Sequence, residues 1–356
     1  MKIRAIDIEN VKDISQGKHN YIFGASDTGK ILFDMLRQEG VAVQGIWDND
    51  TFKQGKKIHD VEIISYEKLC EDEGFNLFIA CAYVLQEESR IQALKDVSLF
   101  QVGKTKEGLK RQFAPVQDKI PRFVEQIQES KKYYKDEMSV SVVDATVEYM
   151  VSYHVEAMQK VVSAEEHYFI AEVMERLPQQ AVFVDCGAFT AEFPGALKKQ
   201  NIHFGRCYCF EMEEANCSIA KQNVRLMGCE DKVEIVHGGV AGQDGYLYFE
   251  SNGASSKLVD YETQDKVQVF SLDTYFQNTK IDFIKMDIEG AELGALKGGM
   301  HVIKRDRPIL AVSVYHSLED RIEIPRYLQE QLDDYDFYLR QHSIWFSETV
   351  LYAVPR

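Results

Sequence analysis

The stretch that decides the fold is VFVDCGAFTAEF, residues 182–193. It reads as a buried strand that ends near Asp185, followed by a turn at Gly187 and the start of a helix. Glycine turns between a strand and a helix usually bind phosphate, because backbone N–H groups and the helix N-terminus attract negative charge. Asp185 puts a carboxylate where a phosphate would lie. The stretch therefore predicts a strand–turn–helix unit whose ligand carries no phosphate.

Strand-like and helical patterns alternate on the C-terminal side of this stretch as far as the end of the chain. The predicted strands are AVFVD, RCYCFE, KVEIVHGGV, IDFIKMD, PILAVSVYH, DFYLRQHS and ETVLYAVP. The last two follow each other without a helix, as in a hairpin. We therefore predict an α/β domain over residues 179–356, with a seven-stranded, mostly parallel sheet whose last strand is antiparallel. The run GQDGYLYFES, residues 242–251, predicts a hairpin insertion, and NGASSKL, residues 252–258, is a candidate substrate lip within it.

Residues 1–104 predict a smaller, doubly wound α/β domain. HNYIFGASDTGKILFDMLRQEG reads strand, glycine turn and amphipathic helix, and VAVQGIWDND, VEIISYEKL and FNLFIACAY add strand-like runs. Gly24 and Gly29 have the spacing G-x-x-x-x-G, but no Ser or Thr follows Lys30 as in a P-loop. Two interpretations stay open. Either a nucleotide lies over Gly24 and Gly29 with its ribose on Asp48, or the glycines only permit a tight turn.

The middle of the chain, residues 105–178, predicts helices that join the two domains and cap the second. SAEEHYFIAEVMERL, residues 163–177, is one of them. Ser163 and Glu166 have the spacing of a capping box at its start.

Charge and composition exclude several classes of function. The 356 residues carry a formal net charge of −16, and no part of the chain forms a basic surface. Binding to nucleic acid or to an anionic membrane surface needs clustered Lys and Arg, so we expect neither partner. The seven cysteines include no CxxC pair, so we expect reduced thiols and a cytoplasmic protein. No apolar run is long enough for a membrane span. The oligomeric state stays open, a homo-oligomer included.

Acidic residues end three of the predicted C-terminal strands: Asp185, Glu211 and Asp287. Ligands of doubly wound sheets bind at the carboxyl ends of the strands. Each like-charge contact with a pyrophosphate would cost roughly 4 kcal/mol at ~4 Å and an effective dielectric constant near 20. S-adenosylmethionine presents a sulfonium, an ammonium, a ribose diol and one carboxylate instead. We therefore predict S-adenosylmethionine as the cofactor, with its ribose on Glu211 and its carboxylate on the amides after Gly187.

The segment IDFIKMDIEGAELGALKGG, residues 281–299, resembles a motif of a known family. Together with VFVDCGAFTAEF, PILAVSVYH and YLRQHS…ETVLYAVP, this segment resembles the FkbM family of methyltransferases over about residues 165–356. The resemblance implies a class I methyltransferase Rossmann-like fold. It also implies S-adenosylmethionine-dependent O-methylation of a hydroxyl on a sugar, glycan or small metabolite. The N-terminal part resembles, more loosely, small Rossmann-like nucleotide-binding modules.

The resemblance also assigns cofactor residues. Met212, which would pack on the adenine, stands where many relatives have proline. Asn216 and Asn223 match asparagines of the following helix, or are surface polar residues. The predicted cofactor-binding residues are Asp185, Gly187, Ala188, Phe189, Thr190, Glu211, Met212, Gly239 and Asp287.

The candidate catalytic residues Asp287, Glu289 and His316 follow the fourth and fifth predicted strands. A hydroxyl acceptor must lose its proton, and His316 is the best-matched base because an imidazole titrates near neutral pH. Asp287 would orient the acceptor or cofactor. Glu292 is expected to lie in the first turn of a helix, where a negative charge interacts favourably with the helix dipole. The three candidates together can hold a divalent ion, but nothing in their spacing demands one, so we expect no metal.

Two other functions stay open. One is an enzyme that modifies nucleotide sugars through the N-terminal domain. The other is a non-catalytic module that binds S-adenosylmethionine.

Overall fold

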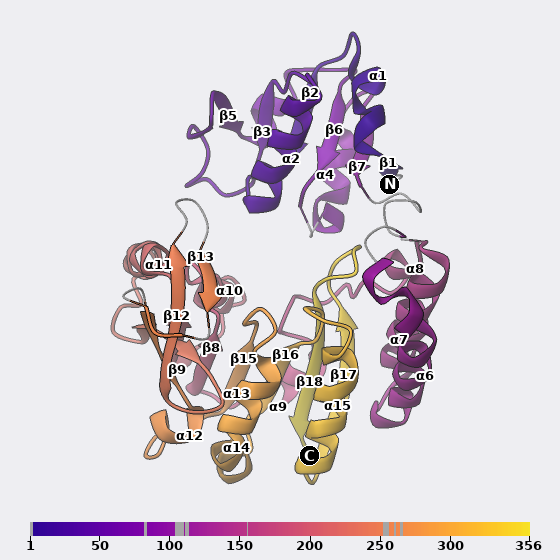
Figure 1. Ribbon diagram of the computed structural model, residues 1–356. Helices are drawn as coiled ribbons and strands as arrows, with labels where there is room; N and C mark the ends of the chain where they lie inside the picture. Colours follow the sequence, from indigo (N-terminus) through magenta and orange to yellow (C-terminus); the bar gives the residue numbers. More distant parts are fainter. Residues whose placement is uncertain are drawn as a thin grey trace. The chain divides into compact units, whose positions relative to one another are not determined.

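The computed structural model describes residues 3–81, 84–103, 110, 114–154, 156–251, 256–259, 261–263 and 266–356. The chain divides into two units (Figure 1). Unit 1 contains residues 1–124, 144–162 and 343–347, and unit 2 contains residues 125–143, 163–342 and 348–356. The predicted linker is shared between the units, and the boundary at residue 104 lies outside the described residues. The three-part division of the chain stays a prediction. Within the described part of the chain, no helix has the length and apolarity that a membrane crossing requires.

Unit 1 has a seven-stranded sheet in the order β1-β7-β6-β2-β3-β5-β4. Its pairs are parallel except β4 with β5. The predicted strands correspond to β2, β3, β5 and β6, whereas the edge strands β1 and β4, and β7 beside β1, were not predicted. The strands are β1 (Ile3–Ile6), β2 (Asn20–Phe23), β3 (Gly45–Trp47), β4 (Lys57–Ile58), β5 (Val61–Ile64), β6 (Asn76–Ile79) and β7 (Ser98–Val102).

Helices cover both faces of this sheet, because successive side chains of a strand point to opposite faces. Ile22 packs in one core with residues of α1 and α2, and its neighbour Phe23 packs in a second core with residues of α3 and α4. Unit 1 is therefore doubly wound, as predicted. Its helical segments are η1 (Ile8–Asn10), α1 (Val11–Ser15), α2 (Asp27–Gln38), α3 (Tyr66–Leu69), η2 (Val84–Glu87), α4 (Glu88–Ala93) and η3 (Ala114–Lys119).

Unit 2 has a seven-stranded sheet in the order β10-β9-β8-β15-β16-β18-β17. The pairs from β10 to β16 are parallel, and β18 is antiparallel to both of its neighbours. This confirms the predicted sheet, including its antiparallel last strand. The strands are β8 (Ala181–Cys186), β9 (Phe204–Glu211), β10 (Val233–His237), β15 (Phe283–Met286), β16 (Ile309–Ser313), β17 (Tyr335–Gln341) and β18 (Thr349–Pro355).

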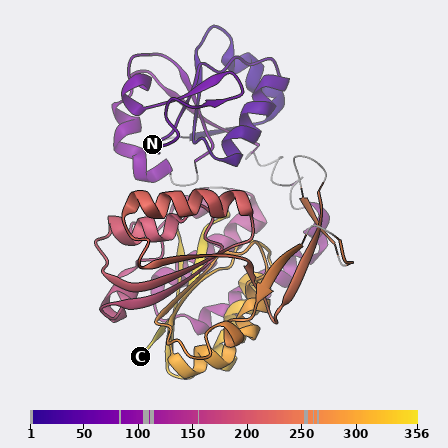
Figure 2. The same ribbon diagram turned by 90° about the vertical axis from the view of Figure 1, so that its left-hand side faces the viewer.

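A second, four-stranded sheet of unit 2 lies to one side of the large one, with the order β11-β14-β12-β13 (Figure 2). Its strands are β11 (Gly239–Val240), β12 (Gly245–Ser251), β13 (Ser256–Val259) and β14 (Lys266–Phe270). The hairpin predicted within residues 242–251 is wrong, because Gly245–Ser251 is a single strand that pairs with β13 and β14. The turn of that hairpin was expected at Asp244 and Gly245. Asp244 instead accepts a hydrogen bond from the Ser271 amide at 2.7 Å, just after β14. Of the candidate lip, residues 252–255 lie outside the described residues.

The helices of unit 2 pack their apolar sides on the large sheet. An aromatic cluster at the centre joins Phe193 of α10 to Phe183 of β8 and Phe283 of β15, with ring centroids 5.7 Å from Phe193 in both cases. Burial of such rings is a main source of core stability. The helices are α9 (Ala171–Arg176), α10 (Glu192–Lys199), α11 (Glu214–Met227), α12 (Leu272–Tyr275), α13 (Glu292–Gly298), α14 (Met300–Asp306) and α15 (Asp320–Gln331).

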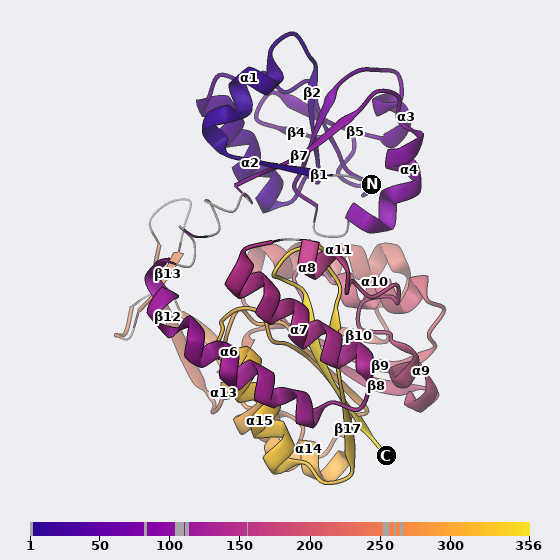
Figure 3. The same cartoon turned by 90° about the vertical axis from the view of Figure 1, so that its right-hand side faces the viewer.

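The predicted connector forms α6 (Ile120–Glu129), η4 (Ser130–Tyr133), α7 (Glu137–Ser152) and α8 (Glu156–Gln159). Figure 3 shows α6, α7 and α8 toward the viewer. The start of α7 is attached to β17, because the Leu339 amide donates to Ser139 Oγ at 2.8 Å. The helix predicted from residue 163 begins only at Ala171, so the capping box is wrong. The carboxylate of Glu165 accepts from the Ala171 amide at 2.7 Å and thereby caps α9. The preceding residues run as irregular backbone, with Tyr168 at φ 70°.

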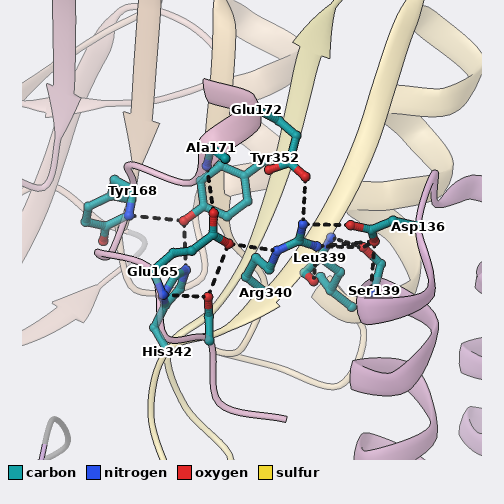
Figure 4. Close-up of polar contacts among 11 residues, drawn as sticks. Asp136, Ser139, Glu165, Tyr168, Ala171, Glu172, Leu339, Arg340, His342 and Tyr352 are labelled. Carbon is teal, nitrogen blue, oxygen red and sulfur yellow. Dashed lines mark hydrogen bonds and ion pairs between the residues drawn. The ribbon is translucent and has the colours of Figure 1, made fainter. Parts of the chain in front are cut away.

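A buried arginine ties this segment to the sheet (Figure 4). Arg340 of β17 is 4% exposed and pairs with Asp136 at 2.7 Å, Glu172 at 3.0 Å and Glu165 at 3.5 Å. The three carboxylates come from the start of α7 and from the segment before and within α9. One guanidinium thus compensates three acids from two segments far apart in the sequence.

His342, two residues further on, is buried beside this network. Its Nε2 lies 2.8 Å from the Tyr352 hydroxyl (Figure 4), and the ring of His167 lies 4.6 Å from its own ring. Burial, followed by the positive charge of Arg340, lowers the pKa of His342 to about 3. His342 is therefore neutral in the folded protein over the whole physiological range.

This burial predicts a loss of stability in mild acid. The unfolded chain protonates His342 below about pH 6.5, whereas the folded chain does not until its pKa of about 3, so stability is present above pH 6.5 and falls as the pH falls. At pH 5 the wild type should have lost about 2 kcal/mol relative to His342→Gln, which cannot titrate. Urea unfolding of both proteins between pH 8 and pH 5 measures the difference. Parallel curves would contradict the prediction.

Candidate active site

The sheet order of unit 2 brings together the three acids predicted at strand ends. Strands β9, β8 and β15 are neighbours, and Cys186 at the end of β8 lies opposite both Phe210 and Met286. The loop that begins at Gly187 therefore lies between Glu211 and Asp287. This is the edge of a doubly wound sheet where ligands bind.

Gly187 makes the closest backbone approach in this region. It has φ 83°, and a Cβ atom at this position would lie 1.9 Å from the carbonyl oxygen of Asp287. The amides of Gly187 and Ala188 both donate to the Phe210 carbonyl, at 3.0 and 2.9 Å. These amides were expected to hold the carboxylate of the cofactor, but they are already engaged in attaching the loop to β9.

Asp185 faces into the protein. It forms a 2.9 Å ion pair with Lys285, and both side chains are buried. Burial raises the pKa of Asp185 to about 6. Burial alone would lower the pKa of Lys285, but the charges of Asp185 and Asp287 raise it. Lys285 also donates to the Gly187 carbonyl at 2.6 Å, so the pair supports the loop from beneath.

Sequence reasoning missed Lys285. A lysine inside the apolar run FIKM was the available signal, but its partner became visible only through the register, which puts Lys285 directly opposite Asp185. A buried lysine needs such a partner to remain charged.

Glu211 is turned toward the loop at the other side. Its carboxylate accepts from the amides of Phe189 and Glu213, each at 2.8 Å. Asn216 lies 3.5 Å from the same carboxylate, and Asn223 donates to the Thr190 carbonyl at 2.9 Å. These contacts give both asparagines a structural part in holding the loop.

Apolar side chains flank Glu211. Phe189 and Met212 are both exposed, although large apolar side chains are normally covered. Gly239 lies against Met212, and a Cβ atom at Gly239 would lie 2.9 Å from the Met212 sulfur. The structure thus brings the predicted residues Met212 and Gly239 into contact.

Asp287 is the centre of the other half of the site. Its two carboxylate oxygens accept from the hydroxyls of Tyr168 at 3.3 Å and Tyr315 at 3.1 Å. Burial alone would raise the pKa of Asp287, but His316 and Lys285 hold it well below its usual value. Sequence reasoning missed both tyrosines. Tyr315 directly precedes His316, but Tyr168 lies in a segment predicted as helix and carried no signal.

His316 lies between acidic side chains. Its Nδ1 is 3.0 Å from Glu292, and its Nε2 is 3.3 Å from Asp287 and 3.7 Å from Glu289. Burial would lower the pKa of His316, but Asp287 and Glu292 raise it to about 10. In this environment the imidazole is protonated at neutral pH, which differs from the titration near neutrality that the sequence suggested.

The two glutamates of the DIEGAE motif have opposite surroundings. Glu289 is 91% exposed and has φ 56°, whereas Glu292 is fully buried in the first turn of α13. Glu292 accepts from the Ile288 amide at 2.8 Å through the same oxygen that faces His316. Glu292 lies in the first turn of a helix, as expected, but it is buried and its carboxylate also faces His316 inside the site.

In the candidate nucleotide loop of unit 1, the residues expected to bind the nucleotide already contact other residues of this unit. Asp48 accepts from the Ala25 amide at 2.7 Å and lies 3.6 Å from Lys53. A Cβ atom at Gly29 would lie 1.9 Å from the Gly24 carbonyl oxygen. Close packing of α2 on the loop therefore accounts for Gly29, and nucleotide binding stays a prediction.

Comparisons with known proteins agree with the fold of the chain. Residues 185–343 match the family model described as the methyltransferase FkbM domain. The chain is similar to the crystal structure of methyltransferase FkbM from Methylobacillus flagellatus KT, with a TM-score of 0.61 and 21% identity over 97% of this chain and 92% of that one. At this identity the similarity shows the fold. No curated protein matches the chain.

Two further solved structures are similar to about half of the chain, with lower TM-scores. An rRNA methylase from Streptococcus thermophilus has a TM-score of 0.36 and 16% identity over 55% of this chain and 100% of that one. A putative methyltransferase from Streptococcus mutans, in complex with SAH, has a TM-score of 0.33 and 11% identity over 51% of this chain and 93% of that one.

Proposed function

We propose that this protein transfers a methyl group from S-adenosylmethionine to a hydroxyl on a sugar, glycan or small metabolite, on the basis of the match of residues 185–343 to the methyltransferase FkbM domain. The observation that carries the proposal is the placement of Glu211 at the end of β9, beside the Gly187 loop and between two exposed apolar side chains. Seven cysteines without a disulfide support a cytoplasmic location.

Glu211 is suited to bind the ribose of the cofactor. Each of its carboxylate oxygens already accepts one strong backbone bond, from Phe189 or Glu213, and has a further lone pair to offer. The carboxylate is thus held in place before a ribose diol arrives. Met212 and Phe189 would contact the adenine, and the glycine at 239 leaves Met212 the room to lie there.

The cofactor loop contributes shape more than amides. The N–H groups of Gly187 and Ala188 donate to the Phe210 carbonyl, so they are not available to the cofactor. The backbone of Gly187 lies against that of Asp287, and the methionine end of the cofactor would therefore lie next to Asp287. The negative charge of Asp287 suits the ammonium and sulfonium groups. Alignment of this kind supplies roughly 7–11 kcal/mol in well-oriented reactions.

The acceptor would bind at the end of the site that contains His316 and Glu289. In-line attack on the methyl carbon forms the new C–O bond, breaks the S–C bond and leaves S-adenosylhomocysteine. The hydroxyl proton passes to this group of side chains, and general-base catalysis of this kind increases the reaction rate by about 10²–10⁴-fold. We propose Asp287, Glu289 and His316 for this task. Because His316 is already protonated at neutral pH, a carboxylate accepts the proton, and Glu289 is the one exposed to solvent, while His316 holds the carboxylates in place.

Calorimetric titration with S-adenosylhomocysteine tests the cofactor. We expect micromolar binding by the wild type and about 100-fold weaker binding by Glu211→Ala, because two charge-assisted hydrogen bonds are lost. Glu211→Gln, which still accepts the Phe189 amide, separates loss of the ribose contact from loosening of the loop. Glu214→Ala, an exposed neighbour on α11, is the matched control and should bind normally.

NAD and a nucleotide sugar are titrated in parallel. Binding of either one, with none of S-adenosylhomocysteine, would overturn the proposal and point to the N-terminal domain as the working site.

A further inference from the structure

The ring of His316 separates two kinds of carboxylate contact. Its side chain is 9% exposed, yet neither ring nitrogen makes a hydrogen bond of good geometry within the described residues. Nδ1 faces the buried Glu292, and Nε2 faces Asp287 and the exposed Glu289. Both nitrogens of this buried imidazole thus face carboxylates without a well-aligned hydrogen bond, and that arrangement requires an explanation.

The distances differ on the two sides of the ring. The 3.0 Å between Nδ1 and Glu292 is a hydrogen-bond distance, whereas Nε2 lies 3.3 Å from Asp287 and 3.7 Å from Glu289. Ligand atoms held at about 2.0–2.2 Å from one metal ion lie roughly 3–4 Å apart, so the distance from Nε2 to each of these two carboxylates fits that of a second ligand of an ion bound to the nitrogen.

Glu292 has the position of an outer carboxylate. Histidines that bind metals through one nitrogen usually donate the other N–H to a carboxylate, which fixes the tautomer and the ring orientation. Glu292 is fully buried, is held by the Ile288 amide, and has a second oxygen without a hydrogen-bond partner in the described part of the chain. One ligand atom each from Asp287, Glu292 and His316 lies within 4.8 Å of the others.

The charges favour a cation at the same place. Three carboxylates surround the one imidazole, and Lys285, whose charge acts on Asp287, is already paired with Asp185 at 2.9 Å. A divalent ion would compensate the remaining negative charge. Glu289 is exposed, so the Nε2 side of the ring has access to solvent.

We propose that a divalent metal ion replaces the proton on His316 Nε2 and binds this nitrogen together with Asp287 and Glu289, with Glu292 as the positioning residue behind the ring. One imidazole nitrogen with two carboxylates suits Mn²⁺ or Zn²⁺ better than Ca²⁺, which takes oxygen ligands. The sequence alone led us to expect no metal here, because nothing in the spacing of these residues demands one. The use of the ion, to bind the acceptor oxygen and favour its deprotonation, rests on the proposed function.

Metal binding is tested without any substrate. The full chain is stripped with a chelator and titrated calorimetrically with Mn²⁺ and with Zn²⁺. We expect one micromolar site for at least one ion, loss of this site in His316→Gln and Asp287→Asn, and about 10–100-fold weaker binding in Glu292→Gln. Glu323→Gln, an exposed acid on α15, is the control and should bind as the wild type does. Circular dichroism of each variant confirms that it is folded.

Direct ligation is read from the wild type by electron spin-echo spectroscopy of the Mn²⁺-loaded chain, where nitrogen modulation reports a histidine ligand. Binding of neither ion, or equal binding by wild type and His316→Gln, would overturn the proposal. A metal site found in a chain that does not bind S-adenosylhomocysteine would uphold this inference and defeat the proposed function.

Discussion

Arg340→Met is expected to lower the free energy of unfolding by about 3–5 kcal/mol, because removing one partner of a buried ion pair leaves the others uncompensated. Three carboxylates, from Asp136, Glu165 and Glu172, would lose their shared cation. Chemical denaturation at pH 7 and moderate salt measures the loss.

Arg356→Met is the matched control for this prediction. Arg356 also pairs with an acid, Asp336, at 2.9 Å, but its side chain is 57% exposed. Exposed pairs contribute about 0–1 kcal/mol, so the control should change little. Arg340→Lys should fall between the two, because an ammonium keeps the charge but not the planar fork. Equal losses in the Arg340→Met and Arg356→Met variants would refute the network as a source of stability.

Gly187→Ala is expected to cost about 3–5 kcal/mol of stability and to abolish binding of S-adenosylhomocysteine. The φ of 83° disfavours any other residue, and the added Cβ atom would lie 1.9 Å from the Asp287 carbonyl oxygen, where neither backbone can easily move. Relief of the clash would separate the ends of β8 and β15 and distort the loop between Glu211 and Asp287.

Gly228→Ala isolates the backbone term. Gly228 ends α11 with φ 66°, and a Cβ atom there would meet nothing within 4 Å. Its replacement should cost only about 1–2 kcal/mol, the usual penalty of the left-handed conformation. The excess loss in Gly187→Ala then measures the clash. If the two variants were equally stable and both bound the ligand, the close approach would have no functional weight.

Local patterns carried most of the fold prediction. The apolar runs of β8, β9, β15 and β16 are long enough to be recognised, and glycines and acids mark their ends. The edge strands β1 and β4 of unit 1 are short, and packing decides whether such segments pair. The segment from Ser163 has a helical composition, yet the Glu165 carboxylate caps the helix at Ala171 and the preceding residues form irregular backbone. Tertiary contacts override weak local preferences in this way.

The sequence by itself determined the doubly wound units, most of their strands and helices, and the three acids at strand ends. Periodicity and turn residues act over a few positions, so they can be read from one chain. Only the tertiary structure decided the partners: Lys285 beneath Asp185, Tyr168 and Tyr315 on Asp287, and Glu292 behind His316. These contacts join residues on different elements, and the charge state of each group depends on burial and neighbours that no local pattern contains.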